Sequence, residues 1–354
     1  MAELAGERVL SIQSHVVFGY VGGKAAVFPL QCLGYDVDVI NTVNFSNHSG
    51  YGRFGGTKST AAELEAIFKS MEMNELLVPQ RLLTGYIPGA EGLSAVAGLV
   101  RRIKAEKPNL IYLLDPVLGD SGRLYVAADV IPIYRNLLPL STIISPNWFE
   151  VETLTQTQLN SIPSLQTALK LLHEQYQVPN VVISSIPLKP WLLSALPQSI
   201  QPPPDSDYLL CISSSSSTDP ISPTSQVHTQ CVPLISGYFS GVGDLFSALL
   251  LAHYIPHHTS PPDHPEETPL SYAASYALTK THAVLERTNE FACTLPEEER
   301  QSTDDEKDHA EPLRQTRRMR GRELRLIQSQ DIIRGDGIGE PRRMECWKGF
   351  WDLH

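Results

Sequence analysis

The chain has 354 residues, of which 42% are hydrophobic and 19% charged, and a formal net charge of −11 at pH 7. These values are ordinary for a globular protein and exclude a wholly disordered, collagen-like or coiled-coil chain. The negative charge leaves only a local basic patch as a means of binding nucleic acid.

Short apolar segments alternate with longer amphipathic ones over about residues 8–186. Segments rich in β-branched and aliphatic residues predict strands over 8–14, 35–40, 81–86, 110–116, 142–146 and 181–185. Amphipathic patterns between them predict helices, for example over 60–71 and 93–106. This alternation is typical of βαβ units. We therefore predict an α/β fold with a central, mostly parallel β-sheet and helices on both faces.

The composition changes after residue 196. Pro/Ser-rich segments over 196–206 and 213–230 predict two loops, because they are too polar to bury a core. The apolar residues between them predict one strand over 207–213. Further helices are predicted over 242–254 and 270–290.

A charged segment, acidic first and then basic, occupies residues 291–322. Such blocks are typical of solvated, disordered segments, so we predict a disordered insertion. Its basic part, residues 314–322, is the one patch that could bind nucleic acid, and we favour the solvated interpretation. Apolar residues over 323–332 predict a terminal strand. We assign all these segments to a single domain spanning 1–354.

Signals for export and membrane insertion are lacking in the sequence. No apolar run approaches the roughly 18 residues of a membrane span. The five cysteines form no CxxC pair, which fits neither a disulfide framework nor a zinc site. We expect a cytoplasmic protein with reduced thiols and no membrane partner, the nucleus being the alternative location.

The strongest local motif is the segment Ser240-Gly241-Val242-Gly243-Asp244, which opens an apolar helix. Glycines let backbone N–H groups face outward at a helix N-terminus, where the helix dipole favours an anion. Asp244 adds a general base beside that anion site, as phosphoryl transfer to a hydroxyl requires. An ordinary capped helix after a glycine turn explains the motif equally well.

Carboxylates also follow two of the predicted strands. Asp115 and Asp120 lie at the end of one strand, where open α/β sheets bind ligands and where paired acids suit a hydrated Mg²⁺. A simple turn is the alternative. Asn147 and Glu150 follow the next strand, and a helix N-cap explains Asn147 equally well.

Two segments near the N-terminus limit the choice of enzyme class. Residues 14–24 follow the first strand and open a helix, yet fit neither the dinucleotide-binding GxGxxG motif nor the P-loop. Residues 44–52 form a polar, aromatic loop that could bind a flat ring. His48 in this loop has no carboxylate at a meaningful spacing, so we favour a structural role for it over a catalytic one.

Several segments, taken in order, closely resemble pyridoxal kinase of the ribokinase superfamily: SIQSHVVFGYVGGKAAVFPLQCLGYDVDVINTVNFSNHSGY, LTGYIPG, LLDPVLGDSGRLYV, IISPNWFE, VVISS, FSGVGDLFSALLLA and ELRLIQSQ. The match covers roughly residues 8–186, 235–290 and 323–332. The resemblance implies a ribokinase-like fold and a homodimer. It also implies that ATP phosphorylates the 5′-hydroxymethyl group of pyridoxal, pyridoxine and pyridoxamine. The implied cofactors are Mg²⁺, or another divalent cation, and K⁺.

The resemblance further implies roles for individual residues. Asp244 would accept the proton of the substrate hydroxyl, while the amides of Gly241, Val242, Gly243 and Asp244 hold the transferring phosphoryl group. The residues that match the vitamer pocket are Ser14 and Ser49, which bond the pyridine ring, and Val21, Phe45 and Tyr86 around it.

The remaining matched positions belong to the ATP and cation sites. Asp120 with Glu150 would organise Mg²⁺ through water. Asp115, Ser145 and Ser184 match the monovalent-cation and phosphate region. The residues matched to ATP are Asp115, Asn147, Glu150, Ser184, Ser185, Gly241 and Gly243, with Tyr125 in a flap that covers the nucleotide.

The sequence departs from the family pattern at Val242, where the family usually has threonine. This change removes a hydroxyl that could touch a phosphate. The flap between Asp120 and Tyr125 is also short. Two alternatives follow: a kinase of a related hydroxymethylpyrimidine, or a weakly active or inactive vitamer-binding protein whose tails recruit partners.

Overall fold

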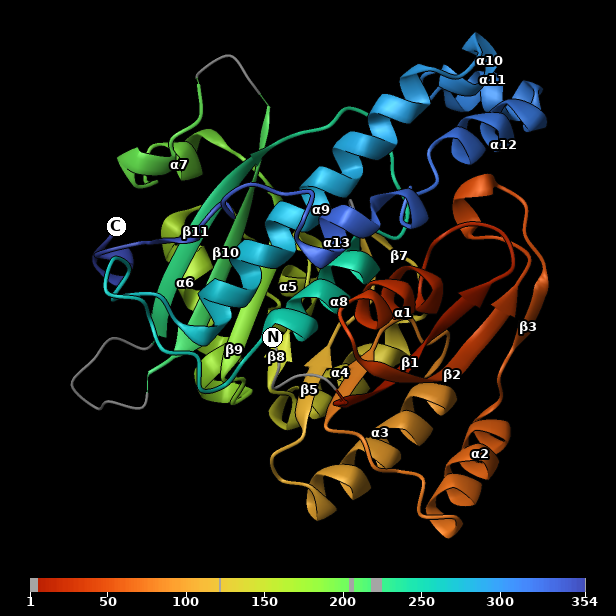
Figure 1. The fold of residues 1–354 in the computed structure, drawn as a ribbon, viewed down its shortest axis with the longest axis horizontal. Coiled ribbons are helices and arrows are strands. Elements are labelled where there is room, and N and C mark those ends of the chain that lie inside the picture. The colour runs from red at the N-terminus through yellow and green to blue at the C-terminus, as the bar shows by residue number, and fades with distance from the viewer. Residues whose placement is uncertain (1–5, 121, 204–206, 218–224, 354) are drawn as a thin grey trace.

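The computed structural model describes residues 6–120, 122–203, 207–217 and 225–353. Within these residues one ten-stranded sheet forms the centre of the molecule, in the order β12-β11-β10-β9-β8-β5-β4-β1-β2-β3 (Figure 1). Its strands are β1 (Arg8–Val16), β2 (Asp36–Phe45), β3 (Gly56–Lys58), β4 (Arg81–Thr84), β5 (Ile111–Leu114), β8 (Ile143–Ile144), β9 (Asn180–Pro187), β10 (Tyr208–Ser216), β11 (Ser225–Pro233) and β12 (Glu345–Cys346). The six neighbouring strands β9, β8, β5, β4, β1 and β2 run parallel. Antiparallel strands extend both edges of this parallel part. The predicted mostly parallel sheet is confirmed.

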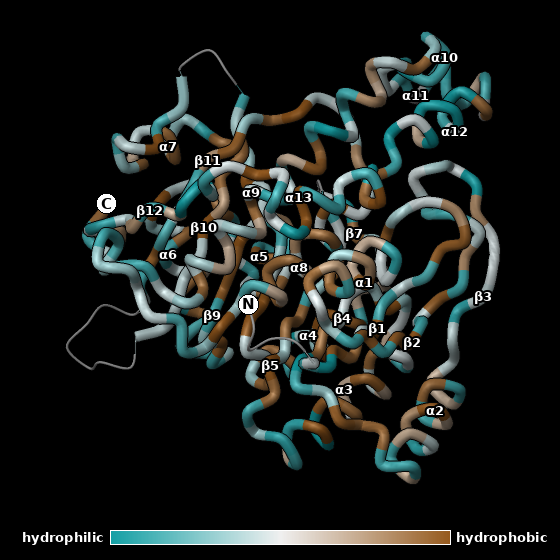
Figure 2. The backbone as a smooth tube through the Cα atoms, in the orientation of Figure 1, coloured by the Kyte–Doolittle hydropathy of each residue, from teal (hydrophilic) through white to brown (hydrophobic). Residues whose placement is uncertain are grey.

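Helices cover both faces of the sheet (Figure 1). One layer contains α1 (Gly23–Cys32), α8 (Val242–His253), α9 (Pro269–Cys293) and α13 (Gln330–Arg334), and the other contains α2 (Ala61–Met73), α3 (Ala90–Glu106), α4 (Ile131–Leu137), α5 (Trp148–Thr155) and α6 (Ile162–Lys170). Successive strand residues supply the two cores alternately, because side chains of a strand point to opposite faces. Leu82, for example, packs against α3, whereas Leu83 packs in the core of α8. In Figure 2 the central strands are accordingly mostly brown.

The Pro/Ser-rich region is more ordered than the sequence predicts. The described part of 196–206 holds a short 3-10 turn at Gln198–Ile200, in keeping with a loop. The predicted loop over 213–230 is wrong for its described residues, because β10 continues to Ser216 and pairs with β11 from Ser225 onward. Two of the serine hydroxyls are paired inside the sheet: Ser214 Oγ donates to Ser225 Oγ at 2.7 Å, and Ser215 Oγ donates to Asn180 Oδ1 at 3.1 Å. Residues 204–206 and 218–224 of these segments lie outside the described residues.

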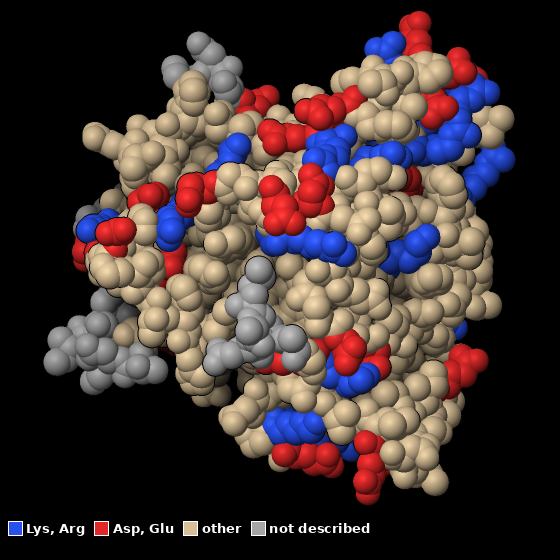
Figure 3. Space-filling model, viewed as in Figure 1, with Lys and Arg blue, Asp and Glu red and all other residues tan. Residues whose placement is uncertain are grey.

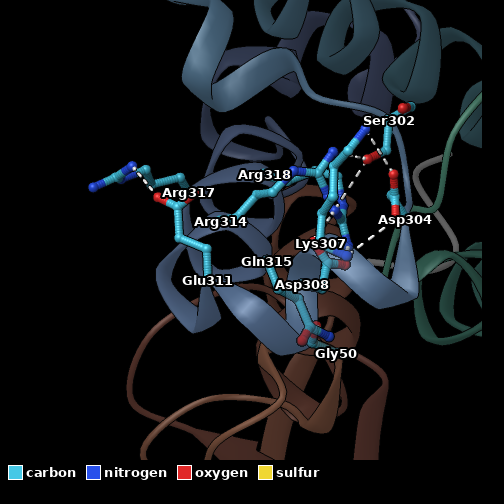
Figure 4. A network of polar contacts seen from close by, with 10 residues as sticks. All are labelled: Gly50, Ser302, Asp304, Lys307, Asp308, Glu311, Arg314, Gln315, Arg317 and Arg318. Atoms are coloured by element: carbon cyan, nitrogen blue, oxygen red, sulfur yellow. Dashed lines mark hydrogen bonds and ion pairs between the residues drawn. The ribbon is translucent and has the colours of Figure 1, made fainter.

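The charged segment 291–322 is likewise not the disordered insertion that was predicted. It contains the end of α9 and three short helices, α10 (Glu297–Arg300), α11 (Asp305–Ala310) and α12 (Pro312–Gly321). Figure 4 shows the reason: acidic and basic residues of the segment pair with one another. The carboxylate of Asp308, only 9% exposed, forms ion pairs with Arg314 and Arg318. Hydrogen bonds from Arg318 hold the pKa of Asp308 below its usual range.

The same pairing accounts for the basic patch. Arg317 bonds Glu311, and Arg320 bonds Glu299. In Figure 3 the blue side chains at the upper right, in the region of α12, have red ones close beside them. These arginines therefore serve the folding of the segment, which weakens the case for nucleic-acid binding.

The predicted terminal strand over 323–332 is wrong. The chain forms a 3-10 turn at Ile327–Ser329 and then α13. Leu324, Leu326, Ile332 and Ile333 are buried in the helical layer beside α9 instead of pairing with the sheet. The prediction was wrong because Leu324 and Leu326 are two positions apart, the spacing of apolar residues on one face of a strand.

No helix in the described part of the chain has the length and apolar character needed to span a membrane.

A buried lysine makes stability depend on pH. Lys280 is 2% exposed, and its Nζ donates to the carbonyl oxygen of Ile333 at 2.6 Å and contacts His253 Nε2 at 3.0 Å. Burial lowers the pKa of Lys280 from 10.5 to about 8. Between these two values the unfolded chain binds more protons than the folded one, so the free energy of unfolding rises with pH. We expect Lys280→Met to remove about 2 kcal/mol of this rise, measured by urea unfolding at several pH values from about 7.5 to about 9.5.

The matched control is Lys58→Met, which removes an exposed lysine. This variant should keep the pH dependence of the wild type. An unchanged pH dependence in Lys280→Met would contradict the expectation.

Candidate active site

The predicted site residues gather at one edge of the sheet, the edge at the carboxyl ends of the parallel strands. Ser14 lies near the end of β1, Asp115 directly follows β5, and Ser145 directly follows β8. Because these strands are parallel neighbours, their ends meet at one place, where open α/β sheets bind ligands. The N-terminus of α8 lies across from this edge: Ser247 Oγ of α8 donates to Asp115 Oδ2 at 2.9 Å.

The N-terminus of α8 is built on a close backbone contact. Gly241, the N-cap residue, has a φ of +79°, and a Cβ there would lie 2.0 Å from the carbonyl oxygen of Tyr20. Only glycine permits this approach. Val242 and Gly243 follow in the first turn, where backbone N–H groups have no partner within the helix. Nothing lies within 4 Å of a Cβ placed at Gly243, so this turn faces open space that an anion could fill.

Asp244 is held by the loop that follows β1. Its Oδ2 accepts a hydrogen bond from the backbone N–H of Gly22 at 2.7 Å. Gly22 in turn packs on Ser14, since a Cβ at Gly22 would lie 2.2 Å from Ser14 Oγ. Burial raises the pKa of Asp244, and the bond from Gly22 opposes that rise. Asp244, predicted from the α8 motif, and Ser14, predicted from the family resemblance, are therefore brought together through one glycine.

Two further carboxylates are buried nearby. Asp115 is 7% exposed, and burial together with the charge of Asp244 raises its pKa to about 8. Glu150 is 3% exposed. Its burial and, to a smaller extent, the charge of Asp115 raise its pKa, while hydrogen bonds from backbone N–H groups oppose the rise. The buried Ser145 Oγ has no hydrogen-bond partner among the described residues.

This excess of buried negative charge beside an unpaired hydroxyl fits a site for cations. The described residues hold no group of three or more His, Cys, Asp or Glu side chains arranged around a common metal position. A Mg²⁺ ion that keeps several waters and binds nucleotide phosphates needs only one or two carboxylates. The two observations are therefore compatible.

Asn147 and Glu150 have a clear structural role. Asn147 is the N-cap of α5, and the two residues form a capping box: Glu150 N donates to Asn147 Oδ1 at 2.9 Å, and Asn147 N donates to Glu150 Oε2 at 2.8 Å. The Asn147 amide also donates to Gly119 O at 2.8 Å, and Leu118 N donates to Glu150 Oε1 at 2.9 Å. The helix-cap interpretation is thus confirmed, and the ATP contacts of both residues stay predictions.

Strand β9, on one side of this edge, contains a strained residue. Ser185 has a φ of +54°, which non-glycine residues rarely adopt. Such strain is concentrated at functional sites. Its neighbour Ser184 forms an isolated bridge with Asn147, which joins β9 to the start of α5.

The predicted flap is the hairpin of β6 (Gly119–Asp120) and β7 (Arg123–Leu124), and residue 121 lies outside the described residues. Tyr125 follows β7 and is 52% exposed. Two effects raise the pKa of the Tyr125 hydroxyl: burial is the larger, and the neighbouring Tyr238 is the next. Tyr125 and Tyr238 thus approach each other, which links the flap to the loop before α8.

On the other side lie the residues predicted for the vitamer. Ser49 begins a 3-10 turn, Ser49–Tyr51, and is exposed. Phe45 ends β2, with its ring 5.2 Å from that of Phe54. Tyr86 follows β4, and its carbonyl oxygen accepts from Thr42 Oγ1 at 2.7 Å. Val21 adjoins Gly22 in the loop after β1 and is partly buried.

Sequence reasoning missed one carboxylate entirely. Glu323 bonds Tyr20 N at 2.8 Å, Tyr51 Oη at 2.7 Å and His48 Nε2 at 3.1 Å. His48 Nδ1 lies 3.3 Å from Ser240 Oγ, so the structural role favoured for this histidine agrees with its contacts. No local motif marks Glu323, because its partners are about 270 to 300 residues away in the chain.

Comparisons with known proteins agree with this geometry. Residues 35–262 match the family model described as phosphomethylpyrimidine kinase. The chain is 37% identical to the pyridoxal kinase of Sus scrofa, over 80% of this chain and 84% of that protein. It is also 37% identical to the pyridoxal kinase of Arabidopsis thaliana, over 94% of this chain and 92% of that protein. Among solved structures, pyridoxal kinase from Leishmania donovani in complex with ADP and pyridoxamine matches with a TM-score of 0.74 and 30% identity, over 96% of this chain and 99% of that one.

Proposed function

Because this chain belongs to the pyridoxal kinase family, we propose that it transfers the γ-phosphoryl group of ATP to the 5′-hydroxymethyl group of pyridoxal, pyridoxine and pyridoxamine. It is an enzyme with the ribokinase-like fold of that family. The observation that carries the assignment is the placement of Asp244 in the first turn of α8, bonded to Gly22, beside Ser14.

Asp244 is proposed as the general base. As the vitamer oxygen forms its bond to the γ-phosphorus, the hydroxyl proton passes to the Asp244 carboxylate and the bond to the β-phosphate oxygen breaks, releasing ADP. The backbone amides of Gly241 to Asp244 would stabilise the charge on the transferred group. The open space at Gly243 supports this role.

The nucleotide and its cations are assigned to the neighbouring strand ends. ATP would bind near Asn147, Ser184 and Ser185, with Tyr125 over it. Asp120 and Glu150 would hold Mg²⁺ through water, and Asp115, Ser145 and Ser184 would hold K⁺. The raised pKa of Asp115, caused by burial and by Asp244, supports a cation at this place. When bound, these cations would neutralise phosphate charge.

The vitamer would lie between the loops after β1, β2 and β4. Ser14 and Ser49 would hydrogen-bond its ring, and Val21, Phe45 and Tyr86 would line the pocket. Their common position at one sheet edge supports this arrangement.

A second candidate substrate is a hydroxymethylpyrimidine, because the matching family model carries that kinase's description. A panel of the three vitamers and the pyrimidine, assayed with ATP, Mg²⁺ and K⁺, separates the two. Preferred turnover of a vitamer supports the proposal, whereas preferred turnover of the pyrimidine contradicts it. Omission of Mg²⁺ or K⁺ in the same assay tests the cation assignments.

Val242 tests whether the chain is a fully active kinase. A threonine at this position would add a hydroxyl at the first turn of α8, and a hydrogen bond to a charged phosphate is worth about 1.5–3 kcal/mol. We therefore expect Val242→Thr to raise kcat about tenfold or more in a vitamer assay.

Val242→Ala is the control, since it changes the side chain without adding a hydroxyl. If Val242→Thr leaves kcat unchanged, the hydroxyl does not reach the transferred group. A wild type that binds vitamers without turnover, with activity gained in Val242→Thr, would instead indicate a vitamer-binding protein.

We also propose that the chain forms a homodimer. Apolar side chains near the outer end of the sheet support this: Val17, Phe18 and Phe54 are 73%, 50% and 51% exposed. Light scattering during gel filtration should give twice the 39.2 kDa mass of the chain. A mass of one chain would contradict the proposal.

A further inference from the structure

Glu323 lies where three separate parts of the chain meet. It follows α12, and its side chain is 12% exposed. Its Oε2 accepts from the N–H of Tyr20 in the loop after β1, and its Oε1 bonds Tyr51 and His48 in the loop after β2. The first loop contacts Asp244 through Gly22, and the second contains Ser49. One carboxylate therefore ties together the two loops assigned to the vitamer.

The contacts of Glu323 determine which nitrogen of His48 carries the proton. Burial alone would raise the pKa of Glu323, but hydrogen bonds from His48, Tyr51 and Tyr20 outweigh it and lower the pKa. An ionised carboxylate only accepts hydrogen bonds, so the proton of a neutral His48 must be on Nε2. Nδ1 is then an acceptor, and the hydroxyl of Ser240, 3.3 Å away, must donate to it. Ser240 immediately precedes Gly241, so this chain of bonds reaches the N-terminus of α8.

The loop after β2 also borders the helices of the charged segment. Between this loop and the helices α11 and α12 there is a cavity of about 600 Å³, lined by Gly50, Tyr51, Arg53, Tyr238, Gln315 and Met319 among others. Figure 4 shows Gln315 reaching from α12 to Gly50, whose carbonyl oxygen accepts from Gln315 Nε2 at 2.9 Å. The hydrogen bonds that hold the loop here include one from Gln315 and two to Glu323.

We propose that Glu323 is a positioning residue for vitamer binding: it fixes the Nε2-protonated tautomer of His48 and holds the loop that carries Ser49 against the loop that contacts Asp244. This inference rests on the proposed function. Glu323 acts through His48, Tyr51 and Tyr20.

Glu323→Gln is the most informative variant, because an amide has the same shape but only one accepting oxygen. If that oxygen keeps the bond from Tyr20 N, the amide nitrogen faces His48 and Tyr51 and donates. His48 must then accept at Nε2 and carry its proton on Nδ1, which reverses the bond with Ser240. The variant therefore changes the direction of the hydrogen bonds without deleting a side chain.

The first measurement is the tautomer of His48. Nitrogen-15 spectra of histidine-labelled protein at a pH of about 8, above the ordinary titration range of histidine, distinguish the two tautomers. The His48 signal among the 11 histidines is assigned with His48→Gln. We expect the Nε2–H form in the wild type and the Nδ1–H form in Glu323→Gln. The Nδ1–H form in the wild type would overturn the proposal.

The second measurement separates vitamer binding from ATP binding. In Glu323→Gln we expect the KM for pyridoxal to rise about tenfold, as for the loss of one hydrogen bond to a charged group, while the KM for ATP changes less than about twofold. Glu299→Gln is the matched control: it removes a nearby carboxylate whose bond is to Arg320 of α12. An unchanged pyridoxal KM in Glu323→Gln, or an equal rise in Glu299→Gln, would overturn the proposal.

These outcomes are distinguishable from failure of the proposed function. If the wild type neither binds nor phosphorylates any vitamer, the function is wrong, and so is the vitamer role of Glu323. The tautomer measurement needs no substrate, so it still decides whether Glu323 controls His48.

Discussion

Asp244→Asn is expected to lower kcat for pyridoxal phosphorylation about 10³-fold, the typical contribution of a general base. Asparagine retains an oxygen that can accept the N–H of Gly22, so the first turn of α8 should keep its place. What the variant loses is the ability to take the hydroxyl proton. The KM values for pyridoxal and ATP should therefore change much less than kcat, as measured by steady-state kinetics.

The control for this variant is Asp263→Asn, which removes an exposed carboxylate. Since burial raises the pKa of Asp244, the wild type should also lose kcat/KM on acidification at a pH above the ordinary range of aspartate, about 4. If kcat for Asp244→Asn stays within about tenfold of the wild-type value, the decrease is too small for the loss of a general base, and the assignment of Asp244 is wrong.

Arg81→Ala is expected to lower the free energy of unfolding by about 3–5 kcal/mol, because a buried guanidinium loses its bonds to two carbonyl oxygens and its ion pair with the partly buried Glu7. Arg81 is 1% exposed and lies at the start of β4. Its Nη1 donates to the carbonyl oxygens of Leu251 and Tyr254 at 2.7 and 2.8 Å, and its Nε bonds Glu7. Removal of the guanidinium leaves the carbonyls at the end of α8 and the Glu7 carboxylate without these bonds.

For a chain of this length such a loss corresponds to a fall in Tm of about 5 °C in calorimetry. Arg102→Ala provides the comparison, because Arg102 bonds Glu72 at the surface and is 42% exposed. Exposed pairs contribute about 0–1 kcal/mol, so this variant should behave almost as the wild type. Equal effects of the two substitutions would show that Arg81 contributes no more than a surface residue.

The parts of the fold that sequence could predict are those specified locally. Strands β1, β2, β4, β5, β8 and β9 were predictable because apolar residues mark them, and α8 and α9 were predictable within a few residues. The α8 motif likewise predicts Asp244 beside an anion site, since two glycines and an acid open an apolar helix. Ser14 was placed near Asp244 only by the family resemblance. The contact itself depends on Gly22, which no pattern singles out.

The features that sequence could not predict depend on distant partners. Helix α12 looks like a solvated basic segment unless Asp308 is known to neutralise Arg314 and Arg318. Strand β11 is polar along the chain, and it forms because β10 and β12 flank it. Glu323 is an unremarkable acid in sequence, and its importance appears only when His48 and Tyr51 are seen beside it.

The bond between Tyr51 and Glu323 joins residues 272 positions apart. A ribosome adding about 5–20 residues per second needs roughly 15–55 s to make the intervening chain. During that time β1 and β2 have already emerged, while the loop after β2 still lacks its carboxylate partner. Completion of the vitamer site is therefore among the late events of biosynthesis, and a nascent chain released before residue 323 would carry the proposed base, Asp244, without a fixed substrate loop.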